Sequence, residues 1–536
     1  MGKDLTCLWR SSSSLGIGEL TRFRIKFNLA KLLSPPTTVE PFPLIIEVKN
    51  STPLIYRGAL LTGPYNISAC ILETRNVCAC LQLKPVLACG EIWRAALDIP
   101  KEGVGDWTAD IFSEVIFSPN KVGYEISVLA ELPEGHYNLR SDNEVISENG
   151  TTVSYTPGIE YEMWKTEDIF RLPDLSNRKI GEEVHLVVLT HGLNGTALDK
   201  KYLKERLEDK YNNQTGTRVV PYVADVNHAS TWDGIEICAR RIADKVLKIA
   251  GWPWNVNSTD IDKEEETSTG PYISKISLTG HSLGGLINVC LAGYLNSLTK
   301  GEFYRSIQAV NFITVATPWL GSTEQPWYIK AGMHVGAVGQ TGKDLLAVQR
   351  TRSEQAQARG AAEENTLEEE PLLLALAHPS SPSHQALVKF QHRTIYANIV
   401  NDVSVSFRTA SLYFIDFDPT SYVKVRPVNL LDHLQHIHNT LNPRVPPIET
   451  FTNQRSAVNP ILHDKLYTPD GIPPPADECA MPIEERIARL WHKDLTWRKV
   501  VVRLEGEAHL SVIVRREWLN KEGKQVIEHL LNEHEF

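Results

Sequence analysis

Positive charge, cysteine and long apolar runs are all scarce in this chain of 536 residues. Lysine and arginine number 55 against 65 aspartates and glutamates, which gives a net charge of −10 at pH 7. Proteins that bind nucleic acid usually carry a basic patch, so this balance argues against a nucleic-acid partner. No run of about 18 uncharged apolar residues occurs, so we expect no transmembrane helix.

The cysteines are too few and too scattered for a disulfide-stapled or zinc-bound fold. Eight occur, and only Cys78 and Cys80 form a tight pair, without a second Cys or His pair at zinc spacing. We therefore expect no metal ion and no cofactor. Polar Ser11–Ser14 stands where a secretory signal peptide needs an apolar centre, which predicts a cytoplasmic protein with free thiols.

We expect residues 1–20 to form a flexible tail. Two regions with different patterns of apolar and polar residues follow it. In residues 21–175, apolar and polar residues alternate, as in Phe23–Leu29 and Tyr124–Leu132. This is the period of half-buried strands, and turn signals such as Gly63-Pro64 separate the runs. The pattern predicts an all-β, sandwich-like accessory domain.

Residues 180–536 alternate short apolar strands with helical stretches. The expected strands are His185–Leu189, Val219–Val223, Ile273–Leu278, Ala309–Val315, Thr394–Val400 and Lys499–Leu504. This alternation is typical of βαβ units on a mostly parallel sheet, so the predicted fold class is α/β. Within this domain we expect an insertion at 345–385 and a proline-rich loop at 442–480.

The stretch Ile276–Gly285 carries the clearest chemical signal. An apolar strand leads into Gly280-His281-Ser282-Leu283-Gly284 and then into a helical pattern, which is the setting of a nucleophile elbow. Gly280 and Gly284 allow a tight turn, and the start of the following helix favours developing negative charge. The pattern predicts Ser282 as a nucleophile.

A serine nucleophile needs a base and an acid that orients the base, and in this fold the chain order is serine, acid, histidine. Asp402 directly follows the expected strand Thr394–Val400, where a carboxylate reaches the crevice at the carboxyl edge of the sheet. Asp416, Asp418 and Asp432 are rivals in weaker positions. We predict Asp402 as the acid.

The base is harder to choose among 17 histidines. His433, His436 and His438 cluster in a helical stretch, and His529 lies in the C-terminal helix. His509 follows the last expected strand, where a loop can place its ring over the serine. We predict His509 as the base.

An oxyanion hole is the remaining part of such a site. The strand that ends near Leu189 runs into His191-Gly192-Leu193, and Gly192 lets the backbone approach closely. The N–H of Leu193 can pair with that of Leu283, the residue after the nucleophile. His191 supports this loop, since a base there has the wrong chain order.

With these residues in place, the chain resembles the fungal serine esterases, lipase-like proteins with an α/β-hydrolase domain after a β-rich domain. The matching stretches are Val48–Ile67, Val187–Gly195, Thr231–Val246, Ile276–Gly285, Phe312–Ser322, Gln340–Leu346, His392–Val405 and Glu507–Arg516. The resemblance implies the α/β-hydrolase fold, with Ser282, Asp402 and His509 as triad. It departs from the family at Trp319, where histidine is usual, which we expect to alter the acyl pocket, and at Ser406, where proline is usual.

The resemblance also implies activity on lipid esters, since the family includes monoacylglycerol lipases and phospholipases of lipid droplets. The first hypothesis is therefore a serine lipase acting through an acyl-enzyme. The alternatives are a soluble esterase or thioesterase of small acyl substrates and a non-catalytic lipid-binding scaffold. A lipase without a membrane span must reach its substrate as a peripheral protein on membranes or lipid droplets. The accessory domain, a lid at Thr351–Leu376 with its leucines facing lipid, or an acylated Gly2 can provide that contact. The alternative to the lid is a disordered acidic loop.

Overall fold

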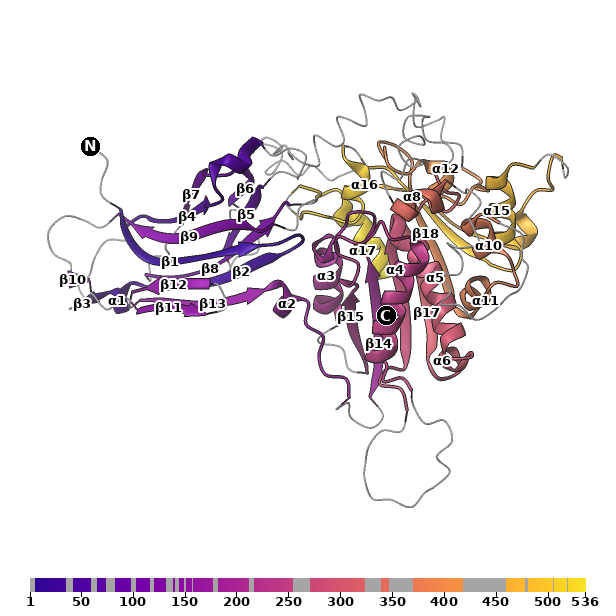
Figure 1. Cartoon of the computed structure of the whole chain (residues 1–536), viewed down its shortest axis with the longest axis horizontal. Coiled ribbons are helices and arrows are strands. Elements are labelled where there is room, and N and C mark those ends of the chain that lie inside the picture. The colour runs from indigo at the N-terminus through magenta and orange to yellow at the C-terminus, as the bar shows by residue number, and fades with distance from the viewer. Residues whose placement is uncertain are drawn as a thin grey trace, which may run out of the picture. The chain divides into compact units, whose positions relative to one another are not determined.

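The computed structural model describes two compact units, one ending at Arg171 and one beginning at Leu172 (Figure 1). The described residues are 5–34, 42–58, 65–73, 82–97, 103–115, 120–131, 138–139, 144–148, 151–156, 158–176, 182–211, 216–253, 270–322, 339–346, 370–417, 459–477, 481–504, 506–517 and 519–536. Within them, no helix is long and apolar enough to cross a membrane.

The first unit is built from antiparallel strands in two main sheets. One sheet has the order β11-β12-β1-β9-β4-β7 and the other β13-β2-β8-β5-β6, and β10 pairs with β3. The strands are β1 (Thr6–Leu15), β2 (Leu20–Asn28), β3 (Leu33–Ser34), β4 (Leu44–Asn50), β5 (Ile67–Glu73), β6 (Gln82–Leu87), β7 (Ile92–Leu97), β8 (Val104–Ser113), β9 (Val122–Ala130), β10 (Asn138–Leu139), β11 (Glu144–Glu148), β12 (Thr151–Tyr155) and β13 (Ile159–Lys165). Short helices α1 (Leu29–Leu32) and α2 (Thr166–Ile169) and the 3-10 turn η1 (Leu54–Gly58) complete it.

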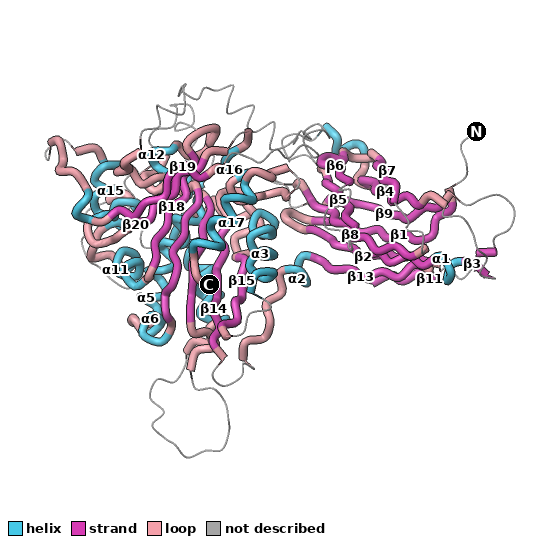
Figure 2. The backbone as a smooth tube through the Cα atoms, turned by 180° about the vertical axis from the view of Figure 1, so that it is seen from behind, coloured by secondary structure: helices cyan, strands magenta, loops and turns pink. Residues whose placement is uncertain are grey.

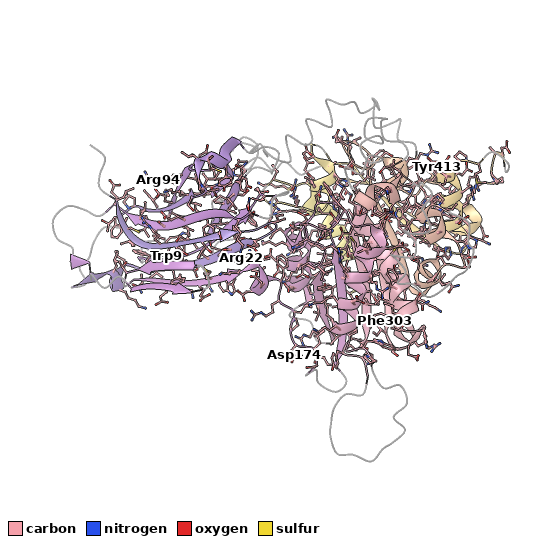
Figure 3. All side chains as sticks on the ribbon, in the orientation of Figure 1. Trp9, Arg22, Arg94, Asp174, Phe303 and Tyr413 are labelled. Carbon is pink, nitrogen blue, oxygen red and sulfur yellow. The ribbon has the colours of Figure 1, made fainter. Side chains whose placement is uncertain are left out.

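Side chains from both sheets share one hydrophobic core. Trp9 of β1 and Phe23 of β2 are fully buried and meet edge to face with ring centroids 5.4 Å apart. Tyr124 of β9 packs on the other side of Phe23. Trp9 lies among the strands in Figure 3, whereas Arg94 of β7 lies at the surface. The alternation read from the sequence therefore places one face of each strand inside this unit.

The expectation of a flexible tail at residues 1–20 is wrong, because β1 occupies most of it. This strand pairs with β9 on one side and β12 on the other. Leu8, Trp9 and Ser11 are buried. Ser11–Ser14 hides the strand in the sequence, since backbone ladder hydrogen bonds do not depend on side-chain polarity and the small Ser11 fits a buried position.

The second unit is centred on a seven-stranded sheet of order β15-β14-β16-β17-β18-β20-β19 (Figure 2). All neighbouring strands are parallel except the edge pair β19–β20. The strands are β14 (Glu183–Thr190), β15 (Thr217–Val223), β16 (Lys275–His281), β17 (Gln308–Val315), β18 (His392–Asn398), β19 (Ile461–Tyr467) and β20 (Trp497–Val502). An α/β unit with a mostly parallel sheet is confirmed.

Helices cover this sheet and carry most of the large core. They are α3 (Lys201–Tyr211), α4 (Ile235–Ile249), α5 (Leu283–Leu298), α6 (Glu302–Ser306), α8 (Gly339–Leu345), α10 (Leu372–Ala377), α11 (Pro382–Lys389), α12 (Phe407–Ala410), α15 (Ile483–His492), α16 (Ala508–Ser511) and α17 (Gly523–Glu533), with 3-10 turns η3 (Ala197–Lys200) and η5 (Pro469–Gly471). Helix α5 packs between α4 and α11. It is apolar nearly all round, as a helix enclosed by neighbours should be.

Two expectations for this unit need correction. Leu372, Leu373 and Leu374 belong to the hydrophobic core rather than to a lid that faces lipid. Residues 347–369 lie outside the described residues, so the rest of the predicted lid is not placed. Part of the predicted loop 442–480 is the edge strand β19, whose mixed burial hid it, because an edge strand exposes much of its length.

Candidate active site

The turn between β16 and α5 holds Ser282 in an uncommon backbone conformation. Its φ is 54° and its ψ is −129°, a region that residues with a side chain rarely adopt. The Ser282 N–H donates to the carbonyl of Val315 at 2.9 Å, and its own carbonyl accepts from Thr317 Oγ1 at 3.0 Å. The neighbouring strand end therefore fixes the strained turn and the side chain that it presents.

The flanking glycines are required by close backbone contacts. A β-carbon on Gly280 would lie 2.5 Å from the carbonyl oxygen of Gly284. One on Gly284 would lie 2.5 Å from the carbonyl oxygen of Thr190. The turn thus packs both on itself and on the end of β14, which is why the predicted motif carries glycine at these two positions.

Asp402 and His509 are brought together from positions 107 residues apart. His509 Nδ1 donates to Asp402 Oδ2 at 2.9 Å, and both side chains are buried. Asp402 Oδ1 accepts from the N–H groups of Ser404 (3.0 Å) and Val405 (2.8 Å), so both oxygens of the carboxylate are held. Asp402 follows β18 as expected, whereas His509 sits in the single turn of α16 rather than in a plain loop.

His281 connects this pair to the serine turn. Its Nε2 donates to the carbonyl of His509 at 2.9 Å, and the two ring centroids are 4.6 Å apart. Burial is the main cause that holds the pKa of His281 well below its usual value. His281 therefore holds His509 through contacts with the residue that directly precedes Ser282. The sequence did not reveal this role, because His281 occupies a variable position of the motif.

The predicted oxyanion loop passes beside the serine. A β-carbon on Gly192 would lie 2.8 Å from Ser282 Cβ and 3.3 Å from Ser282 Oγ. The next residue, Leu193, is partly buried against the core. Leu283 opens α5, so its N–H is among the N-terminal amides that no helix carbonyl accepts. The structure brings both predicted backbone segments to Ser282.

His191 lies inside this loop as a neutral group. Its Nδ1 donates to the carbonyl of Gly192 at 3.0 Å, and its ring lies 5.5 Å from that of His228. Burial is the main cause that lowers the pKa of His191 to about 4. These contacts agree with the supporting position that the chain order predicts for His191.

Behind the loop lies a buried charged group that sequence reasoning missed. Asp199 is paired with Arg515 at 2.9 Å and accepts from the N–H of Thr196 at 3.0 Å. The adjacent Lys200 is 1% exposed, and its Nζ has no hydrogen-bond partner in the described part of the chain. Burial lowers the pKa of Lys200 to about 7. No local pattern distinguishes a buried lysine from a solvated one.

The rival residues are occupied elsewhere or not placed. Asp416 pairs with Lys465 at 2.8 Å, and His529 bonds to Tyr396 at 3.0 Å. Asp418, Asp432, His433, His436 and His438 lie outside the described residues. Throughout the placed segments, no group of three or more His, Cys, Asp or Glu is arranged to hold a metal ion.

Trp319, the departure expected to alter the acyl pocket, is a core residue. It is fully buried between Trp491 and Trp497, with ring centroids 5.5 and 5.1 Å away. Its Nε1 donates to Thr314 Oγ1 at 3.2 Å. The large ring therefore packs in the hydrophobic core, and its effect on the acyl pocket stays a prediction.

Comparison with known proteins agrees with the site. Residues 181–412 match a family model described as "Putative serine esterase (DUF676)". The chain is 27% identical to a Saccharomyces cerevisiae protein named "Putative lipase YDL109C", over 98% of this chain and 88% of that protein. It is 28% identical to "Putative lipase ROG1" of the same yeast, over 98% and 83%. A Schizosaccharomyces pombe protein, "Putative lipase C4A8.10", is 25% identical over 78% and 65%.

The matched segment contains the serine turn, the predicted oxyanion loop and Asp402, and its description agrees with the strained serine and the buried histidine–carboxylate pair. Residues 181–412 therefore match the serine esterase family, and the chain is a carboxylic ester hydrolase.

Proposed function

We propose that this protein hydrolyses carboxylic esters of lipids, of the monoacylglycerol or phospholipid type, with Ser282, Asp402 and His509 as its catalytic triad. The observation that carries the triad is the 2.9 Å hydrogen bond between buried His509 and Asp402, beside the strained turn at Ser282. The names of the yeast relatives support a lipid ester as substrate.

The proposed reaction begins with proton transfer from Ser282 to His509. Because Nδ1 of His509 donates to Asp402, the neutral ring has an unprotonated Nε2 that can accept the Ser282 proton. Ser282 Oγ then bonds to the ester carbonyl carbon. As the bond to the alcohol oxygen breaks, His509 returns the proton to the leaving alcohol. Water, deprotonated by His509, releases the acid and restores Ser282.

The charge that develops on the carbonyl oxygen needs donors that are already in place. We assign the N–H groups of Leu193 and Leu283 to this task, since Gly192 brings the loop against Ser282 and α5 begins at Leu283. Preformed backbone donors of this kind typically contribute about 10²- to 10³-fold to the rate.

The same proposal places the protein at membrane or lipid-droplet surfaces as a peripheral, cytoplasmic enzyme. A water-insoluble ester is reached at an interface, and reversible contact is sufficient for a hydrolase. The first unit, interpreted as an all-β accessory domain, is either the contact surface or a cover for the hydrolase unit. Removal of the first unit distinguishes the two roles, because only a contact surface predicts that vesicle binding is then lost.

The decisive experiment measures hydrolysis by the purified full chain on a substrate panel. Monoolein and phosphatidylcholine in mixed micelles are compared with short-chain p-nitrophenyl esters, and Ser282→Ala is the control. We expect release of long-chain fatty acid that Ser282→Ala abolishes. Activity confined to short soluble esters or thioesters would instead establish the soluble esterase. A folded chain without any hydrolysis would establish the lipid-binding scaffold.

A further inference from the structure

A cavity in the hydrolase unit lies between α10, α15 and the segment after β19. Its volume is about 620 Å³, and none of the three proposed triad residues lines it. The lining residues are Glu370, Leu374, His378, Pro469, Ile472, Pro473, Pro474, Met481, Arg486, Arg489, Leu490, His492 and Lys493. Cavities of about 300–1,000 Å³ hold small ligands in proteins, so the size suits one.

The centre of this cavity is apolar. Leu374 of α10 is buried, and Leu490 of α15 and Met481 are half-buried beside it. His492 adds a neutral wall, since its Nδ1 donates to the carbonyl of Ala488 at 2.7 Å and burial lowers the pKa of its ring to about 3. An alkyl chain can lie against these side chains without leaving a charge uncompensated.

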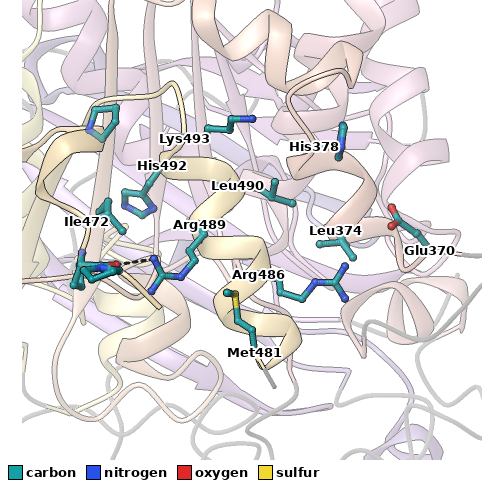
Figure 4. Close-up of a pocket in the computed structure, with 13 residues that line it drawn as sticks. Glu370, Leu374, His378, Ile472, Met481, Arg486, Arg489, Leu490, His492 and Lys493 are labelled. Carbon is teal, nitrogen blue, oxygen red and sulfur yellow. Dashed lines mark hydrogen bonds between the residues drawn. The ribbon is translucent and has the colours of Figure 1, made fainter. Parts of the chain in front are cut away.

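Two cations flank the apolar centre. Arg486, Leu490 and Lys493 are spaced at i, i+4 and i+7, which places them on one face of α15 and its end. Figure 4 shows Leu490 and Leu374 between Lys493 on one side and Arg486 on the other. Both cations are exposed, and neither side chain has an ion-pair or hydrogen-bond partner among the described residues.

The third cation of the cavity is already compensated. Arg489 donates to Glu485 Oε1 at 2.6 and 2.9 Å and to the carbonyl of Pro473 at 2.7 Å. Glu370 is the one acidic side chain in the lining. Arg486 and Lys493 against Glu370 therefore leave one net positive charge beside an apolar surface, in a chain whose net charge is −10.

We propose that this cavity binds a long-chain carboxylate, that is, a free fatty acid. The chain lies over Leu374 and Leu490, and the carboxylate accepts hydrogen bonds from the guanidinium of Arg486, while Lys493, at the opposite end, adds positive charge to the cavity. A guanidinium binds a carboxylate in a two-bond geometry, which favours Arg486 as the principal contact. A fatty acid is also the acid that the proposed lipid hydrolysis releases. That link rests on the proposed function, whereas the binding itself does not.

Binding is measured by titration calorimetry on the full chain after its nucleophile has been blocked with a fluorophosphonate. Three probes separate the contributions: monomeric oleate, oleyl alcohol with the same chain and no charge, and butyrate with the charge and no chain. We expect one equivalent of oleate to bind, and the other two to bind at least about tenfold more weakly. Equal binding of oleyl alcohol, or loss of oleate binding on blocking, would overturn the proposal.

A pair of variants tests the named residues. Arg486→Gln with Lys493→Gln should weaken oleate binding about tenfold or more, and both positions are exposed, so folding is preserved. Lys245→Gln with Lys248→Gln, exposed on α4, removes the same charge and should leave binding unchanged. Unchanged binding in the first pair, or recruitment to anionic vesicles without binding of monomeric oleate, would refute the site. With Ser282 unblocked, the first pair should hydrolyse p-nitrophenyl butyrate at the wild-type rate. Loss of ester hydrolysis is thus a separate readout from loss of oleate binding.

Discussion

The two units differ in how particular buried charged groups are compensated. In the first unit, Asp110 and Asp106 are buried on β8, and each is compensated by a guanidinium of β2, from Arg22 at 2.7 Å and Arg24 at 2.9 Å. In the second unit, Lys200 is buried without a hydrogen-bond partner in the described residues. An unpartnered buried amine reduces stability, and such groups are found more often at functional sites than elsewhere.

Backbone strain divides the units in the same way. Every described non-glycine residue with positive φ lies in the second unit. Asn194 follows the oxyanion loop, Ser282 is the proposed nucleophile, and Asn401 precedes the proposed acid. Such conformations cost on the order of 1–3 kcal/mol each, and they persist only where the surroundings enforce them. The hydrolase unit therefore carries a cost in stability that the first unit does not.

The largest expected effect comes from removing the proposed nucleophile. Ser282→Ala should lower kcat on any ester by at least about 10⁴-fold, because no other hydroxyl replaces Oγ at the turn. Ser297→Ala, at the other end of the same helix, is the control and should keep full activity. A fall in kcat of less than tenfold in Ser282→Ala would contradict the proposed link between backbone strain and catalysis in the second unit, since the strained turn would then serve no chemical purpose.

The next effect comes from the orienting carboxylate. Asp402→Asn keeps the shape but leaves an amide that can donate to His509 Nδ1, which favours the wrong tautomer. We expect a loss of about 10³- to 10⁴-fold in kcat with little change in Tm, measured on a soluble ester. Asp416→Asn should behave as wild type, and equal losses in both variants would remove Asp402 from its assigned role.

A smaller loss is expected from crowding the oxyanion loop. Gly192→Ala places a methyl group 2.8 Å from Ser282 Cβ, so the loop must shift away from the serine. Activity should fall about 100-fold, since the shift moves the donors that stabilise the oxyanion. Gly270→Ala is the matched control, because no atom lies within 4 Å of a β-carbon there. If Gly192→Ala retains full kcat, Leu193 does not supply the oxyanion contact.

Lys200 should make stability depend on pH. Its pKa is about 7 in the folded chain against a usual 10.5, so the unfolded chain binds more protons between those values and stability rises with pH across that window. Lys200→Met removes this dependence. It should raise the free energy of unfolding by a few kcal/mol near pH 7 and progressively less towards pH 10. A gain of equal size at both pH values would show that Lys200 is not buried as a neutral group.

The smallest effect is expected in the first unit. Arg22→Gln leaves Asp110 without its directly paired cation and should destabilise the unit by about 1–2 kcal/mol. The rate on a soluble ester should stay within twofold of wild type, as it should for Arg94→Gln at the surface. A clear loss of kcat in Arg22→Gln would break the contrast between the units.

The sequence predicted what is local in the chain. The turn at Ser282 is encoded within about ten consecutive residues, and Asp402 follows from its place after a strand. The buried roles of His281 and Lys200 were missed, because burial of a polar side chain depends on segments far away in sequence, such as Arg515 and His509. Strand β1 was missed for the related reason that its polar serines pair through the backbone.

A run of leucines led to the opposite error, in which a buried segment was predicted to be exposed. Leu372–Leu374 carries an apolar signal that a lid and a core helix share, and only packing against α15 distinguishes them. Six of the seven strands of the hydrolase sheet were predicted, and five of them are internal, where strands buried on both faces are continuous apolar runs. The edge strand β19 was not predicted, since it is partly exposed to solvent and lacks a continuous apolar run.

The most direct measurement is fluorophosphonate labelling of the intact chain, followed by mass spectrometry of its peptides. The predicted result is one adduct on Ser282, absent in Ser282→Ala and formed far more slowly in Asp402→Asn. An adduct on another residue, or labelling of Ser282→Ala at the wild-type rate, would contradict the assignment of this turn as the catalytic centre.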